Sequence, residues 1–117
     1  MAGLRPTRTH EETAELDLDP GAAAEVVSDV IENLGYLVRG ETEPGGTRAT
    51  LRGVIGTGSL TRNPAVVDVV LEPRPGGGSR ATVRTAANEG LIPQHTAPKS
   101  ARRLLESYEQ ATATAGR

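Results

Sequence analysis

The sequence predicts an α+β domain in which two helices cover one face of a five-stranded antiparallel sheet. Three observations predict this fold. Five segments have strand patterns, either alternating apolar and polar residues or a run rich in β-branched residues, and two segments repeat apolar residues at helical spacing. Pro/Gly-rich turns join consecutive strands, which favours antiparallel pairing. The predicted order is β-α-β-β-β-β-α, a two-layer sandwich. Because the first helix must cross the sheet, we expect the first strand to pair with the last.

The first strand is expected over residues 9–18, after a flexible arm at residues 1–8, and the first helix follows directly. Asp19 can cap this helix, Pro20 suits its first position, and Gly35 is expected to end it in the left-handed conformation. Alternation in the strand separates an inward apolar face from an acidic one. The inward residues are Ala14, Leu16 and Leu18, and the acidic ones Glu11, Glu15 and Asp17.

Four further strands are expected in residues 36–41, 47–55, 65–72 and 79–87. Glycine- and proline-rich turns separate the first from the second and the third from the fourth of these segments. The segment AVVDVVLE is rich in β-branched residues, which is typical of a central strand. In this segment we expect Val67, Val69 and Leu71 to face the helices and Val66, Asp68 and Val70 to face away.

The final helix is expected over residues 98–113, where an apolar stripe recurs at helical spacing. The predicted single domain therefore covers residues 9–113, and residues 114–117 form a fraying tail. The stripe consists of Ala101, Leu104, Leu105, Tyr108 and Ala111.

The composition excludes several classes of site. The 117 residues favour one domain and contain no Cys, Phe or Trp, so disulfides, thiolate metal sites and cysteine nucleophiles are excluded. The net charge of −2 provides no strong field for nucleic acid or an anionic membrane. The absence of Cys fits a cytoplasmic protein, which is the expected location. No apolar run approaches the length of a membrane span, and the N-terminus lacks the apolar region of a secretory signal.

This element order resembles the TATA-binding-protein-like arrangement and, more loosely, a reduced helix-grip fold such as that of the START and Bet v 1 proteins. The resemblance covers roughly residues 9–113 and rests on element order, without a sequence motif of either family. TATA-binding proteins carry two such repeats and wedge aromatic side chains into DNA, whereas this chain has one repeat and no Phe. Helix-grip proteins are usually longer and enclose an apolar cavity, so this resemblance implies a pocket between the sheet and the last helix.

The segment GVIGTGSLTRNP, Gly53–Pro64, is rich in glycine but does not fit a phosphate-binding loop. It contains no lysine, and a β-branched strand follows it where phosphate-binding loops continue into a helix N-terminus. We therefore interpret it as a connection between two strands, or as a strand with a bulge at Gly56 or Gly58. Its glycines would permit close approach of another backbone.

The helix-free face of the sheet is expected to carry arginines on two strands and acids on two others. In the predicted strand order these would form cross-strand charge pairs, and the face has no aromatic residues to stack bases, so nucleic acid is not predicted. Exposed valines, joined by Leu37, favour coverage by a second copy of the chain, and the alternative is a solvated charged face. The predicted interface is Arg48, Arg52, Val66, Asp68, Val70, Arg80 and Arg84.

Motifs for catalysis and metal binding are missing from the sequence. His10 and His95 have no metal-ligand spacing, Ser59 lies in G-T-G-S, which is not a nucleophile elbow, and Glu11 and Glu12 point to opposite faces of a strand. No catalytic residue, metal or cofactor is predicted. The loop at residues 88–100 gathers Asn88, Glu89, Gln94, His95 and Lys99, and we interpret it either as a functional loop or as a solvated crossover.

A ligand pocket is the remaining candidate site. Small inward residues on the strands leave either space for an apolar ligand or room for close helix packing. The predicted ligand-binding residues are Leu104, Leu105, Tyr108 and His95.

Taken together, the residues predict a small soluble, non-catalytic interaction module that self-associates through the sheet as a homodimer or other homo-oligomer. The alternative is a carrier of a small apolar ligand between the sheet and the C-terminal helix. An enzyme that uses the loop around His95 is a third possibility.

Overall fold

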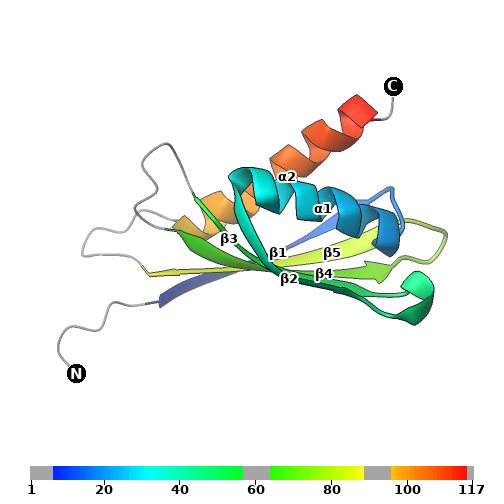
Figure 1. Cartoon of the computed structure of the whole chain (residues 1–117), viewed down its shortest axis with the longest axis horizontal. Helices are drawn as coiled ribbons and strands as arrows, with labels where there is room; N and C mark the ends of the chain where they lie inside the picture. The colour runs from blue at the N-terminus through cyan, green and yellow to red at the C-terminus, as the bar shows by residue number, and fades with distance from the viewer. Residues whose placement is uncertain (1–6, 57–63, 89–95, 116–117) are drawn as a thin grey trace.

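The computed structural model describes residues 7–56, 64–88 and 96–115 and has the predicted order of elements (Figure 1). The sheet order is β1-β5-β4-β3-β2 with every neighbouring pair antiparallel, so the pairing of first and last strands is confirmed. The elements are β1 (Thr7–Leu16), α1 (Pro20–Leu34), β2 (Gly35–Thr42), the 3-10 helix η1 (Pro44–Gly46), β3 (Ala49–Ile55), β4 (Ala65–Pro73), β5 (Ser79–Asn88) and α2 (Thr96–Ala115).

The bounds of two elements differ from the prediction: β1 is shifted by two residues towards the N-terminus, and α2 is longer at both ends. Strand β1 begins at Thr7 because β5 continues far enough to pair with it, with Asn88 opposite Thr7. Helix α2 begins at Thr96 and includes Ala115, so it reaches into both the predicted loop and the predicted tail. Among the described residues, no helix is long and apolar enough to cross a membrane.

Both helices lie on one face of the sheet, and the core fills the space between the two layers (Figure 1). The predicted inward residues of β4 are confirmed, since Val67, Val69 and Leu71 are at most 1% exposed. Aliphatic side chains and alanine build almost all of this core, and Tyr108 of α2 is its aromatic member. The opposite face of the sheet has no helix over it and is called the open face below.

Helix α1 starts as predicted and ends differently. The Asp19 side chain accepts a hydrogen bond from Ala22 N at 2.9 Å, and Pro20 occupies the first turn. Gly35 was expected in the left-handed conformation, and this prediction is wrong, because its φ is 179°. Gly35 instead opens β2, where an added Cβ would collide with the Val54 carbonyl oxygen. Glycine is therefore required by close packing of backbone rather than by a helix-terminating turn.

The prediction that Leu37 joins the open face is also wrong. Leu37 lies opposite Gly53 and packs against the core. A bulge between Leu37 and Arg39 changes the register, so that Arg39 lies opposite Arg52. The bulge also interrupts the regular hydrogen-bonding edge of β2, which is an edge strand, and this irregularity hinders pairing with a strand of another chain.

Gly53 accounts for the first part of the glycine-rich segment. It is buried in β3, and an added Cβ would meet the Ile31 side chain of α1 and the Tyr36 carbonyl oxygen. Just beyond, Gly56 N donates to Leu34 O at 3.0 Å, which ties the end of β3 to the end of α1. The glycine thus permits close helix–sheet packing, and residues 57–63, including Gly58 and Ser59, lie outside the described part of the chain.

Candidate functional site

A groove lies between the end of β1 and the C-terminal half of α2. Its volume is about 480 Å³, and one side is open to solvent. One wall comes from β1 and the connection to α1, and the other from the helix. The lining residues are Ala14, Glu15, Leu16, Asp17, Leu18, Leu105, Tyr108, Glu109, Thr112 and Ala113.

The helix wall arises from the apolar stripe of α2. Leu104 is 1% exposed and is a member of the core between the layers. Leu105 is half-buried and lines the groove together with Tyr108. Two of the predicted ligand-binding residues are therefore in this groove. Leu104 is not among its lining residues, and His95 lies outside the described residues.

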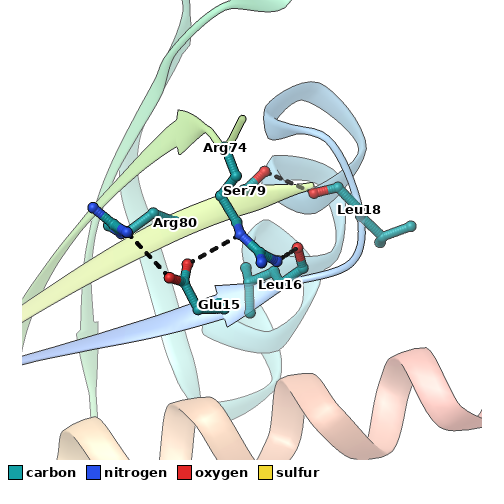
Figure 2. A network of polar contacts seen from close by, with 6 residues as sticks. All are labelled: Glu15, Leu16, Leu18, Arg74, Ser79 and Arg80. Carbon is teal, nitrogen blue, oxygen red and sulfur yellow. Dashed lines mark hydrogen bonds and ion pairs between the residues drawn. The ribbon is translucent and has the colours of Figure 1, made fainter. Parts of the chain in front are cut away.

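The β1 wall is held in place by residues from the β4–β5 hairpin (Figure 2). The Ser79 hydroxyl donates to Leu18 O at 2.7 Å, and the Arg74 guanidinium donates to Leu16 O at 3.5 Å. Arg74 also pairs with Glu15 at 3.3 Å, and Glu15 forms a second ion pair with Arg80 at 3.2 Å. The backbone is thus anchored on both sides of Asp17, the residue between the two bonded carbonyl groups.

The hairpin can reach this wall because of its glycines. Gly76, Gly77 and Gly78 all have positive φ, which glycine adopts without strain. At Gly78 an added Cβ would collide with the Leu16 carbonyl oxygen. The Gly-Gly-Gly turn, predicted only as a chain reversal, therefore also allows close contact with the end of β1.

Tyr108 is the most unusual residue of the groove. The residue is only 4% exposed, and its buried hydroxyl has no hydrogen-bond partner among the described residues. Buried tyrosine hydroxyls usually have such a partner. Burial raises the pKa of the Tyr108 hydroxyl, and the negative charge of Asp17 raises it further. The phenol therefore stays protonated at neutral pH and is able both to donate and to accept a hydrogen bond.

Of the described residues that line the groove, those that are charged are all acidic. Glu15 is neutralised by two arginines, whereas Asp17 and Glu109 form no ion pair with any other described residue. The sequence pattern assigned Asp17 to the open face by continuing the strand alternation. The strand instead ends at Leu16, so the alternation stops there and Asp17 belongs to the groove wall. The nearby helix cap, Asp19 followed by Pro20, was the sequence signal for this end.

The open face brings together the residues of the predicted interface. Val66, Asp68 and Val70 of β4 alternate with the buried residues of that strand. Arg52 lies opposite Asp68 on β3, and Arg84 lies opposite Asp68 on β5. The remaining two members lie nearer the ends of the strands: Arg80 lies opposite Glu72, and Arg48 directly precedes β3.

The predicted cross-strand charge pairs are confirmed on this face. Arg52 pairs with Asp68 at 2.7 Å, Arg84 with Glu11 at 2.7 Å, and Arg80 with Glu15 at 3.2 Å. Three of the four arginines are thus paired within the chain. This arrangement stabilises strand register and leaves little unpaired charge for a partner.

A histidine–carboxylate pair lies on the helix side of β1. His10 Nε2 is 2.7 Å from Glu12 Oε1, and the two side chains are 30% and 29% exposed. Neither residue lines the groove. The described residues contain no cluster of three potential metal ligands.

Comparison with known proteins supports the fold. No protein-family model matches the chain, and no curated protein matches it. Among solved structures, the crystal structure of Ara h 8.0201 is similar, with 14% sequence identity and a TM-score of 0.50. The match covers 93% of this chain and 99% of that chain. Ara h 8 is a Bet v 1-like protein, so the Bet v 1-like part of the predicted resemblance is supported at the level of the fold.

Proposed function

We propose that this protein is a binding protein that holds a small, largely apolar molecule in the groove between β1 and α2. One observation carries the proposal: Tyr108 lines the groove, and its buried hydroxyl has no hydrogen-bond partner among the described residues. An unsatisfied buried hydroxyl costs free energy, about 1–3 kcal/mol, and a bound ligand is one way to recover it.

The size and lining of the groove support this proposal. Its volume of about 480 Å³ is in the range of small-molecule sites. Leu16, Leu18 and Leu105 provide apolar surface, and the bonded carbonyl groups of Leu16 and Leu18 make one wall rigid. A wall that is already ordered reduces the entropy lost on binding. The prediction that the protein is not an enzyme stays a prediction.

Binding of the neutral fluorescent probe N-phenyl-1-naphthylamine tests this proposal. The probe should increase in fluorescence when it enters the groove. Ala113→Trp places a large side chain in the groove at an exposed position of α2, and we expect it to weaken probe binding at least about tenfold.

Ala111→Trp is the matched control, because Ala111 is an exposed residue of the same helix that does not line the groove. It should leave probe binding unchanged. No saturable binding by the wild-type protein, or equal loss in both variants, would overturn the proposal.

Self-association through the open face is a second candidate function, and one cross-strand row favours it. Tyr36, Val54, Val66 and Ala86 lie opposite one another on four neighbouring strands. Tyr36 is 58% exposed and Val66 is 38% exposed, so the expectation that this face carries no aromatic residue is wrong. An exposed apolar row of this kind fits a self-complementary contact with a second copy.

Light scattering at several concentrations tests this candidate. A mass that rises towards twice that of the chain, and that falls in the Val66→Ser variant, would support a dimer through this row. Val26→Ser on α1, a half-buried position on the other side of the sheet, is the control for general loss of packing. A monomer at every concentration would overturn the candidate.

A further inference from the structure

We propose that the ligand of the groove is a cationic amphiphile: a primary ammonium group attached to an apolar chain or ring. This inference rests on the proposed binding function and names the chemistry of the ligand. It is carried by the arrangement of three kinds of surface in one groove, namely apolar walls, unpaired carboxylates and an unsatisfied buried hydroxyl.

The apolar part of the ligand would contact the leucines. Leu18 and Leu105 are only half-buried although both pack against the core, so part of each side chain remains available at the groove. Covering such surface contributes about 25 cal/mol for each Å² removed from water. These contacts favour any apolar molecule and do not select its charge.

The carboxylates select the charge. Asp17 and Glu109 come from opposite walls of the groove and form no ion pair with any described residue. Among the described residues, no basic side chain that would attract an anion lines the groove. A ligand with a carboxylate or sulfonate would therefore be repelled at this site, whereas an ammonium group would be attracted.

Tyr108 provides the directional contact. Its hydroxyl has no hydrogen-bond partner among the described residues, and the residue is more than nine-tenths buried at the groove wall. Asp17 lines the same groove as Tyr108, and its negative charge adds to the effect of burial in raising the pKa of this hydroxyl. An ammonium group beside both would donate one N–H to the phenol oxygen and another to the Asp17 carboxylate. A primary ammonium has enough donors for both contacts.

Competition between three eight-carbon compounds tests the charge preference. Octylamine and 1-octanol have the same alkyl chain, and octanoate has the same number of carbon atoms with a carboxylate as its head group. Each is used to displace N-phenyl-1-naphthylamine at neutral pH, where octylamine is an ammonium ion. We expect octylamine to displace the probe at roughly tenfold lower concentration than octanol, and octanoate to be the weakest.

Variants of the carboxylates make the test specific. Asp17→Asn should weaken displacement by octylamine about two- to fivefold and leave octanol unchanged. Glu32→Gln on α1 changes the net charge equally and lies outside the groove, so it should have no effect. Tyr108→Phe should reduce the affinity for octylamine while the unfolding transition stays cooperative.

The outcomes separate the two proposals. If octylamine and octanol compete equally, and Ala113→Trp blocks both, the groove binds apolar molecules but the charge preference is wrong. Equal effects of Asp17→Asn and Glu32→Gln would also overturn the charge preference. If none of the three compounds displaces the probe and the probe itself does not bind, the proposed function is wrong as well.

Discussion

Arg52 and Asp68 form a two-point ion pair between β3 and β4 at the centre of the open face. Arg52 Nε donates to Asp68 Oδ1 at 2.7 Å, and Nη2 donates to Oδ2 at 3.1 Å. The hydrogen bond to Asp68 and its negative charge together raise the pKa of Arg52. Asp68 also lies opposite Arg84, which pairs with Glu11 on β1, and Arg39 lies opposite Arg52, so two carboxylates and three arginines form one cross-strand row.

This row predicts unequal effects of removing its two central charges. Asp68→Asn leaves three arginines in the row with only the carboxylate of Glu11 at its end, so it should lower the melting temperature by more than Arg52→Gln does. The difference should shrink at high salt, because these side chains are exposed and salt screens their repulsion. Thermal unfolding followed by circular dichroism at low and high salt measures both effects. Equal melting temperatures of the two variants at low salt would contradict the prediction.

Alternation and helical spacing predicted the two layers correctly because burial determines both patterns. Val67, Val69 and Leu71 are inward as expected, since a one-residue shift in β4 would expose all three. The sequence pattern failed where the backbone departs from regular geometry. The bulge after Leu37 and the extended conformation of Gly35 depend on contacts with β3, which lie far away in the sequence.

The candidate site was only partly predictable for the same reason. Leu105 and Tyr108 could be found because they belong to the apolar stripe of one helix. Asp17 could not be assigned to the groove from the sequence, since its place in the groove wall depends on where β1 ends. Nor could the contributions of Arg74 and Ser79, because they bond to backbone carbonyl groups about sixty residues away along the chain. Contacts between side chains and distant backbone leave no periodic signal.

The close packing around Gly53 predicts that adding even a methyl group at this position destabilises the protein. An added Cβ would meet the Ile31 side chain and lie 2.9 Å from the Tyr36 carbonyl oxygen, which is too close for carbon. We expect Gly53→Ala to lower the free energy of unfolding by about 1–3 kcal/mol, the usual cost of overpacking. Urea denaturation measures this change.

Gly40→Ala is the control, because it makes the same change in a strand at a position that is not closely packed. At Gly40 the nearest atoms to an added Cβ, on Leu51 and Leu37, are 3.7 and 3.8 Å away, which is ordinary contact. This variant should be close to wild type in stability. If both variants lose the same stability, strand propensity rather than close packing against α1 explains the requirement for glycine.

The hydrogen bond from Ser79 to the groove wall predicts that stability and ligand binding are linked. Its hydroxyl is fully buried and donates to Leu18 O in the groove wall. Ser79→Ala leaves this carbonyl group without its donor and should cost about 1 kcal/mol of stability. Because the wall is then less ordered, binding of N-phenyl-1-naphthylamine should also weaken. Thr82→Ala, at a half-buried position on the other face of β5, should leave probe binding unaltered, and a parallel loss there would count against the proposed role of Ser79.

The raised pKa of Tyr108 predicts a loss of stability at alkaline pH. The chain has two tyrosines, so Tyr36→Phe leaves Tyr108 as the only phenol whose ionisation is followed by ultraviolet absorbance. In the folded protein it should ionise above the value of 10.0 that applies to an unperturbed tyrosine, mainly because burial disfavours the phenolate. The folded state then holds a proton that the unfolded state has lost. Stability is therefore fully present below about pH 10 and declines as the pH rises through the folded pKa.

Urea denaturation of the Tyr36→Phe variant at pH 9 and pH 10.5 should show that decline. Adding Tyr108→Phe should remove the part of the decline that belongs to the phenol. Ionisation of folded Tyr108 at or below its value in urea would show that the hydroxyl is accessible to water, and the central observation behind the groove would be lost.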